Sequence, residues 1–121
     1  MKQTARAVII RDGRLLLVTA HDKGYYWLPG GTVEDGESMV EALHRELAEE
    51  LGVSALWHKL YKSYKTDDRH LDVFLVSIEG DIAIDNGITD YQWYSIDSDI
   101  EVGEQFKNTI LKDLIVDRLI V

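Results

Sequence analysis

The sequence of 121 residues contains no cysteine and only one proline. Without cysteine, the chain forms neither a disulfide nor a thiolate zinc site, and it has no redox chemistry of its own. Its apolar runs stay well below the about 18 residues that a membrane helix needs, and the first one is too short for a signal peptide. We therefore expect a cytoplasmic protein with no membrane partner.

Positive charge is scarce as well. The 13 lysines and arginines are outnumbered by 22 aspartates and glutamates, which gives a formal net charge of −9. A general nucleic-acid binder is more often basic, so no nucleic-acid partner is expected. An acidic chain can still bind a polyphosphate when cations screen the encounter, which is a first indication of a metal ion.

No repeat or linker divides the chain, so we expect one domain over residues 1–121. Helical spacing of apolar residues predicts helices over about 38–51 and 104–119. Runs of β-forming residues predict strands over 4–11, 14–20, 27–28, 56–64, 71–78 and 91–96. This order predicts an α/β (α+β) fold with a mixed β-sheet between helices. The strand over 71–78 is nearly continuous in apolar residues and should be central in its sheet.

The segment over residues 31–53 carries the most informative pattern. Ser38 and Glu41 predict a capping box at the start of a helix, and Gly52 predicts its end. The helix would bury one apolar stripe formed by Val40, Leu43, Leu47 and Leu51. Beside that stripe it would present three carboxylates, those of Glu46, Glu49 and Glu50. Hard oxygen ligands gathered in this way suit Mg²⁺ or Mn²⁺, and a cation removes their mutual repulsion.

The full spacing of this segment is G-x5-E-x7-R-E-U-x-E-E-x-G-U, where U is a bulky aliphatic residue. It resembles the signature of the Nudix (MutT-like) hydrolases, and every fixed position is filled, from Gly31 through Glu37 to Val53. The preceding WLPGG, residues 27–31, also resembles the family's lead-in. The resemblance implies an α/β/α sandwich, a Mg²⁺ or Mn²⁺ cofactor, and hydrolysis of a nucleoside diphosphate linked to another group.

The resemblance also implies roles for the three carboxylates of the helix. Glu49 and Glu50 would be direct metal ligands. Glu46 would be either a further ligand or the group that takes a proton from the attacking water. Glu46 and Glu49, together with Arg45, are thus the candidate catalytic residues.

Other residues of the segment would support these carboxylates. Arg45 lies one helical turn before Glu49 and would hold that carboxylate bidentately while leaving a lone pair for the metal. By resemblance, Glu37 braces the loop and Arg45. The pair Gly30 and Gly31 would bring a backbone carbonyl to the metal, with Gly31 as the candidate ligand and Gly30 as a structural residue of the site.

Candidates for substrate contacts lie outside the segment. Tyr26 and Trp27, with Tyr25, could stack on a nucleobase. Some family enzymes use a further loop carboxylate a few residues before a tryptophan that matches Trp93, but here that position is a glycine. The nearest acids are Asp85 and Asp90, which are therefore the candidates. Three cationic residues could touch phosphates: Arg6, Lys23 and Lys65.

The substrate is chosen by elimination. Family enzymes for ADP-ribose and for NADH carry prolines downstream of the motif, whereas the one proline here, Pro29, precedes it. The diadenosine-polyphosphate enzymes tend to have a tyrosine past the motif, and residues 69–71 contain none. This favours (deoxy)nucleoside triphosphates, including oxidised ones. The alternatives are an ADP-ribose or nucleotide-sugar pyrophosphatase, a non-catalytic nucleotide sensor, and an RNA-end pyrophosphohydrolase. Both a monomer and a homodimer are compatible with the sequence.

Overall fold

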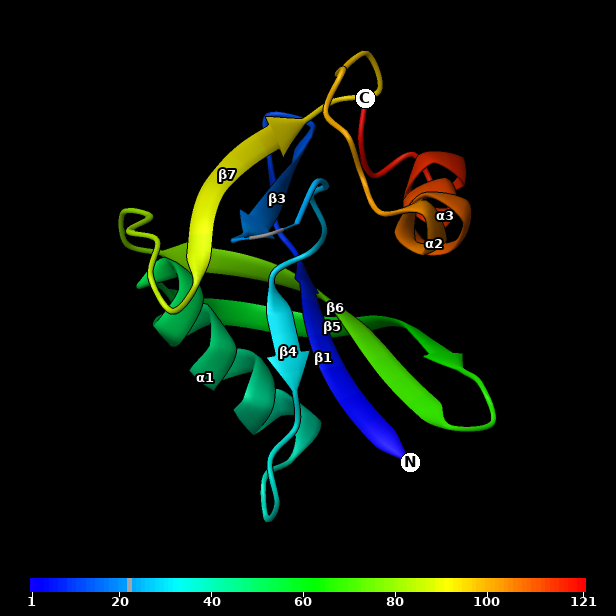
Figure 1. Ribbon diagram of the computed structural model, residues 1–121. Helices are drawn as coiled ribbons and strands as arrows, with labels where there is room; N and C mark the ends of the chain where they lie inside the picture. The colour runs from blue at the N-terminus through cyan, green and yellow to red at the C-terminus, as the bar shows by residue number, and fades with distance from the viewer. Residues whose placement is uncertain (22) are drawn as a thin grey trace.

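The computed structural model describes residues 1–21 and 23–121, which form two sheets between helical layers (Figure 1). The larger sheet has the order β4-β1-β6-β5, with β1 parallel to β6 and the other pairs antiparallel. Its strands are β1 (Lys2–Val8), β4 (Gly30–Thr32), β5 (Ser54–Lys65) and β6 (Arg69–Glu79). The smaller sheet has the order β2-β3-β7, with strands β2 (Ile10–Arg11), β3 (Arg14–Ala20) and β7 (Ile88–Tyr94).

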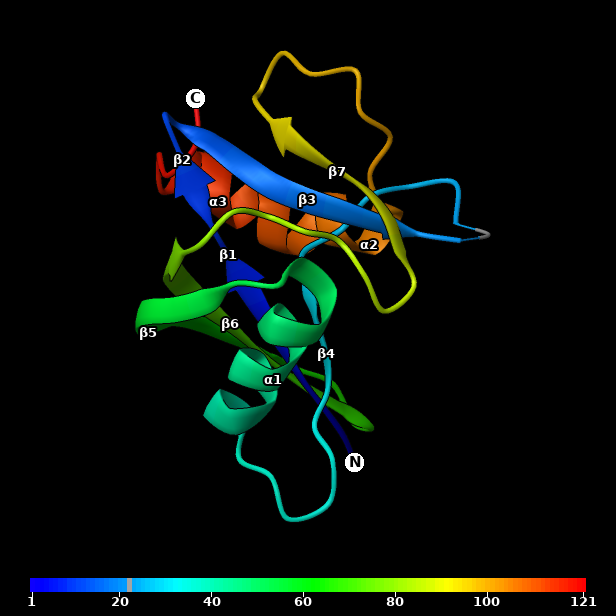
Figure 2. The same cartoon turned by 90° about the vertical axis from the view of Figure 1, so that its left-hand side faces the viewer.

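Helices lie on opposite sides of these sheets (Figures 1 and 2). On one side is α1 (Met39–Leu51). On the other is a continuous helical segment made of α2 (Glu104–Phe106), the π-helical turn η1 (Lys107–Leu111) and α3 (Lys112–Val116). The α/β/α sandwich with a mixed sheet is therefore confirmed. No helix in the described part of the chain is both long and apolar enough to cross a bilayer.

Two hydrophobic cores join the layers, and both sheets contribute to each. The first core packs α1 against the sheets through residues that include Ala5, Ala7, Leu16, Val18, Leu43, Leu47, Leu51 and Phe74. The second packs the C-terminal helical segment against the opposite faces through residues that include Val8, Leu15, Leu17, Val73, Phe106, Ile110 and Leu114. Neighbouring residues in β1 and β3 thus alternate between the two cores, as the two-residue period of a strand requires.

The ends of α1 are set by local chemistry. Ser38 accepts a hydrogen bond from the Glu41 backbone N–H, and the Glu41 side chain accepts one from the Ser38 N–H. At the other end Gly52 has a φ of 65°, the left-handed conformation that closes a helix. The predicted capping box and helix stop are confirmed, and of the predicted apolar stripe all but the half-buried Val40 are fully buried.

Several strand predictions need correction. The strand expected over 27–28 lies instead at Gly30–Thr32, and Trp27 makes only an isolated bridge to Val18. The single strand expected over 4–11 is divided into β1 and β2, which belong to different sheets. The strand expected over 91–96 begins earlier, at Ile88, and ends at Tyr94. As predicted, β6 lies inside its sheet, between β1 and β5.

The misplaced short strand has a physical reason. A Cβ atom on Gly30 would lie 2.1 Å from the Ala5 carbonyl oxygen, and Gly30 has a φ of 136°. Only glycine can therefore pair with β1 at this distance. The two glycines lie outside the strand expected over 27–28, yet they form most of β4, because a close backbone approach overrides their low β propensity.

Candidate active site

The pair Gly30 and Gly31 lies directly against the carboxylate face of α1. The Gly30 N–H donates to Glu50 Oε1 at 2.9 Å in a buried hydrogen bond. A Cβ atom on Gly31 would lie 2.5 Å from Glu46 Oε1. The absence of a side chain at both positions lets β4 approach α1 until backbone and carboxylates are in contact. The structure thus brings together four residues predicted for one site: Gly30, Gly31, Glu46 and Glu50.

Arg45 connects the loop before α1 to the carboxylates. Its Nε and Nη2 donate to the two oxygens of Glu37, at 2.7 and 3.0 Å. Its Nη1 donates to Glu46 Oε1 at 3.0 Å and to Glu49 Oε2 at 3.3 Å. A further bond runs from Nη2 to the Thr32 carbonyl of β4, at 3.1 Å. The bidentate partner of Arg45 is therefore Glu37, not Glu49 as expected, because the loop places Glu37 opposite the guanidinium fork.

The pKa values of this ion pair follow from its geometry. Hydrogen bonds from Arg45, with a further one from the Glu34 backbone N–H, lower the pKa of the Glu37 carboxyl to about 2. Contact with Glu37 in turn raises the pKa of Arg45. Both groups therefore stay charged throughout the physiological range. Glu37 anchors Arg45, which fits the bracing role that the resemblance implies for it.

Glu50 is the buried member of the cluster, with 8% of its surface exposed. Burial raises the pKa of its carboxyl to about 7, and the nearby Glu46 adds to the effect. The hydrogen bond from the Gly30 N–H opposes the rise. A buried carboxylate with this pKa gains from a nearby cation, which would return it to its charged form.

The carboxylates of Glu46, Glu49 and Glu50 are suitable ligands for a hard divalent cation, although their side chains are not arranged around one point. Within the described residues, no three acidic or histidine side chains converge on a common point. The reason is visible in the contacts: Glu46 and Glu49 turn toward Arg45, and Glu50 turns toward Gly30. Carboxylate oxygens are the ligands that Mg²⁺ and Mn²⁺ prefer. Glu49, whose side chain is 44% exposed, has the most freedom to turn toward an ion.

The loop before β7 contacts the same helix, but not through the Asp85 side chain, as expected. The Asp85 backbone N–H donates to the Glu50 carbonyl, while its side chain accepts from the Asn86 N–H at 2.8 Å. The side chain that contacts the carboxylate of a predicted ligand is that of Asn86, whose Nδ2 donates to Glu49 Oε2 at 3.3 Å. Sequence reasoning looked for a carboxylate here and therefore missed this amide.

Tyr26 and Asp90, two predicted substrate contacts, are direct partners. The Tyr26 hydroxyl donates to Asp90 Oδ2 at 2.5 Å, and Gln92 Nε2 donates to the same oxygen at 3.1 Å. These bonds lower the pKa of Asp90, and the bond to Asp90 raises the pKa of Tyr26. Asp90 and Gln92 are two residues apart on β7 and so share a face, a signal that could have added Gln92 to the candidates.

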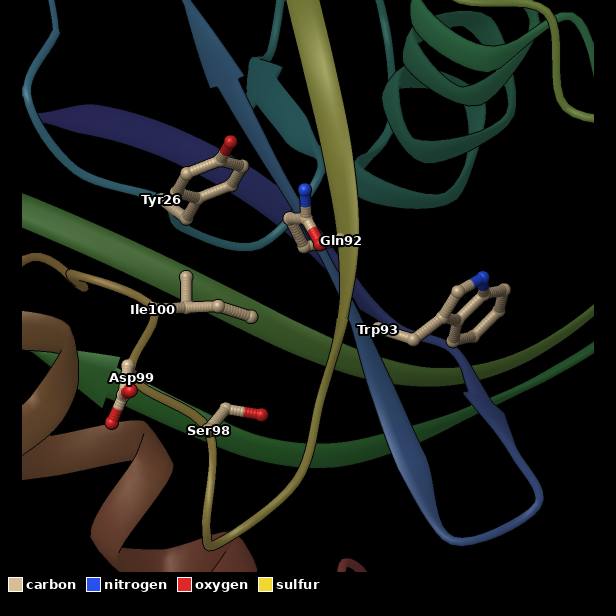
Figure 3. A pocket seen from close by; sticks show the side chains of 6 residues that line it. All are labelled: Tyr26, Gln92, Trp93, Ser98, Asp99 and Ile100. Carbon is tan, nitrogen blue, oxygen red and sulfur yellow. The ribbon is translucent and has the colours of Figure 1, made fainter.

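A pocket of about 450 Å³ lies beside this pair (Figure 3). Its lining residues are Tyr26, Gln92, Trp93, Ser98, Asp99 and Ile100. Figure 3 shows Tyr26, Gln92 and Ile100 around one side of β7, with the Trp93 ring pointing away from them. Trp27 does not line this pocket; its ring packs against that of Tyr25, with centroids 5.3 Å apart.

Comparison with known proteins identifies the family of the chain. Residues 1–114 match the family model of the NUDIX domain, and the chain belongs to the Nudix family. It is 34% identical over 108 residues to the nucleoside triphosphatase NudI of Escherichia coli, covering 71% of this chain and 76% of that protein. It is 36% identical over 74 residues to an ADP-ribose pyrophosphatase of Methanocaldococcus jannaschii, covering 59% and 44% of the two chains.

The fold has close structural relatives as well. A solved structure of MutT, from work on Aliivibrio salmonicida and Vibrio cholerae, superposes with a TM-score of 0.84 at 24% identity, covering 96% of this chain and 98% of that one. The matched regions span less than half the length of the first curated relatives, at 44%, 28% and 44%. Family and fold are therefore confirmed, while the individual roles of the site residues stay predictions.

Proposed function

We propose that the protein is a divalent-cation-dependent pyrophosphohydrolase of (deoxy)nucleoside triphosphates, oxidised ones included. Water attacks phosphorus, one phosphoanhydride bond breaks, and the products are a nucleoside monophosphate, pyrophosphate and a proton. The observation that carries the proposal is the contact of Gly30 and Gly31 with Glu46 and Glu50, beside an Arg45 that holds Glu46 and Glu49.

We assign the residues of this contact to metal binding, to proton transfer and to orientation of the carboxylates. Glu46, Glu49 and Glu50, with the Gly31 carbonyl, would hold Mg²⁺ or Mn²⁺. When bound, the ion would neutralise charge on the phosphoryl oxygens and lower the pKa of a bound water. Glu46 or Glu49 accepts the proton of the attacking water. Arg45 keeps both carboxylates oriented, and Glu37 keeps Arg45 in place.

The nucleoside would bind at the β7 side of the site. The pocket beside Tyr26 is large enough for a nucleobase and offers both an aromatic ring and polar groups. Because Gln92 donates its amide N–H₂ to Asp90, its amide carbonyl is left to accept from a base. The loop before β7 also reaches the carboxylate cluster, because Asn86 donates to Glu49.

A nucleoside triphosphate is favoured over ADP-ribose by the similarity to NudI, which extends over more of this chain than the similarity to the ADP-ribose enzyme. The position of the one proline, before the motif, points the same way. ADP-ribose remains the second candidate because a relative named as an ADP-ribose pyrophosphatase matches over 59% of this chain. A sensor that binds nucleotide without turnover is the third.

The decisive experiment measures release of phosphate and pyrophosphate from nucleoside triphosphates, nucleotide sugars, ADP-ribose and dinucleotides, with Mg²⁺ and with Mn²⁺. The wild type is compared with Glu49→Gln and with Glu79→Gln, a control that removes an exposed carboxylate at the end of β6. We expect turnover of triphosphates that is lost with Glu49→Gln and with chelator but kept with Glu79→Gln. Preferred cleavage of ADP-ribose would select the second candidate, and binding without any turnover would leave only the sensor.

A further inference from the structure

Arg6 lies in the middle of β1, on the sheet face turned away from α1. Its neighbours Ala5 and Ala7 belong to the core under α1, so alternation along the strand directs Arg6 to the opposite face. The side chain is half-buried there, and its Nη1 donates to the Leu28 and Gly30 carbonyls, each at 3.0 Å. One edge of the guanidinium is thus fixed to the backbone that leads into β4.

A single glycine separates this guanidinium from the carboxylate cluster. The Gly30 carbonyl accepts from Arg6, and the Gly30 N–H donates to Glu50. Burial lowers the pKa of Arg6, whereas the negative charges of Glu50 and Glu46 oppose the change. An arginine keeps its charge in a protein even so. A fixed positive charge therefore stands directly across β4 from the residues that would hold a cation.

The other edge of this guanidinium is open. Within residues 1–21 and 23–121, Arg6 Nε and Nη2 form no hydrogen bond, and no buried side-chain nitrogen lacks a partner. These donors are therefore reachable from solvent. Arg45 differs in this respect, because each of its three nitrogens already donates to a carboxylate or to a carbonyl.

We propose that the open edge of Arg6 binds a phosphate group of the substrate and so fixes the polyphosphate relative to the carboxylate cluster. This inference rests on the proposed function. Nε and Nη2 form a planar pair of donors that matches two oxygens of one phosphate. A substrate with several negative charges must approach an acidic chain, and Arg6 provides a positive group beside the acids that is not already neutralised by them. If Arg6 served only to brace the Leu28 and Gly30 carbonyls, its effect would be on stability.

The test compares Arg6→Gln and Arg6→Lys with Arg14→Gln, which removes the same charge from an exposed position on β3. KM and kcat are measured for triphosphates of different bases, and thermal unfolding is followed for each variant. We expect Arg6→Gln to raise KM about tenfold, by a similar factor for every base, with a smaller change in kcat. Arg6→Lys should recover part of the loss because it restores the charge, and Arg14→Gln should behave as wild type.

Two outcomes would overturn the proposal. If Arg6→Gln lowers the melting temperature but leaves KM unchanged, Arg6 is a brace for β4. If the rise in KM differs strongly from base to base, Arg6 contacts the nucleobase and not a phosphate.

A binding measurement separates this inference from the proposed function. Titration calorimetry with inorganic triphosphate and Mg²⁺ needs no turnover. Weaker binding to Arg6→Gln than to the wild type and Arg14→Gln would support a phosphate contact even if no nucleotide is hydrolysed. Equal binding by all three would reject it, even if the enzyme is active.

Discussion

At the scale of single residues, Glu50 shows a conflict between stability and chemistry. Its carboxylate is buried beside Glu46, and its pKa is raised to about 7 from an ordinary value near 4.5. The folded state therefore holds a proton that the unfolded state releases. Between these two values the contribution of Glu50 to the stability of the folded state falls as pH rises. Above about pH 7 the buried carboxylate is charged, and its full destabilising effect is present. In the absence of a cation, the residue opposes folding at neutral and alkaline pH.

Replacing Glu50 by glutamine removes that penalty. In the presence of a chelator at pH 8, we expect Glu50→Gln to be more stable than the wild type by up to about 3 kcal/mol. The difference should vanish near pH 4.5, where Glu50 is protonated. Denaturant unfolding at the two pH values measures it, with Glu49→Gln as a control because that side chain is 44% exposed. Mg²⁺ should stabilise the wild type more than the glutamine variant.

A Glu50→Gln protein that is less stable than the wild type at pH 8 would contradict this account. It would mean that the unpaired amide N–H₂ costs more than the buried charge it replaces. Activity should be lost in either case, because glutamine is a weaker ligand for a hard cation.

At the scale of elements, the contact between β4 and α1 depends on two glycines with different requirements. A side chain at Gly30 would meet the Ala5 backbone at 2.1 Å, and its φ of 136° is outside the range of other residues. A side chain at Gly31 would meet only the end of the flexible Glu46 side chain. The first glycine is thus needed for the sheet, and the second for the arrangement of the carboxylates.

Alanine substitutions should separate these two requirements. We expect Gly30→Ala to destabilise the fold by more than about 3 kcal/mol, since the backbone of β1 must move. Gly31→Ala should fold but lose most of its activity, because Glu46 is displaced. Gly24→Ala is the control, as a Cβ atom there meets nothing within 4 Å. Circular dichroism, thermal unfolding and the hydrolysis assay give the three readouts, and an active Gly31→Ala protein would contradict the account of Glu46.

Local sequence predicted some elements of this site well and others poorly. The limits of α1 follow from Ser38, Glu41 and Gly52, which act within a few residues of one another, and they were predicted correctly. The position of β4 depends on its pairing with Ala5 and Arg6. Local sequence propensity contains no information about such a long-range pairing. For the same reason, the contact between Asn86 and Glu49, which are 37 residues apart in the sequence, was missed.

At the scale of the whole molecule, the carboxylates of α1 lie on one side of the sandwich, and the C-terminal helical segment covers the other. On the far side, β5 is tied to α3 by a small polar cluster. Tyr61 donates to Asp117, and Tyr64 donates to Asp113 Oδ2 at 2.6 Å. Lys62 Nζ lies 3.3 Å from the Asp117 carboxylate. This cluster fixes the C-terminal helical segment over the second core, and none of its contacts involves the carboxylates of α1.

The cluster should therefore affect stability without affecting catalysis. Burial, followed by the hydrogen bonds to the aspartates, raises the pKa of both tyrosines above their ordinary value near 10. Their contribution to stability is thus complete below pH 10 and is lost as pH rises through the folded-state pKa. At pH 7 we expect the double variant Tyr61→Phe/Tyr64→Phe to be about 2 kcal/mol less stable than the wild type, with unchanged kcat and KM.

The difference in the free energy of unfolding between the double variant and the wild type should become smaller as pH rises above 10. Ionised tyrosines no longer donate a hydrogen bond, and the aspartates repel them. Denaturant unfolding across this range, with Tyr91→Phe as a control that removes a hydroxyl outside the cluster, measures the effect. If this difference in the free energy of unfolding stays constant with pH, packing of the rings, and not their hydroxyl hydrogen bonds, joins β5 to α3. A change in KM would mean that the polar cluster affects substrate binding. In that case, a shift of the C-terminal helical segment would alter the pocket beside Tyr26 through the packed residues of the second core.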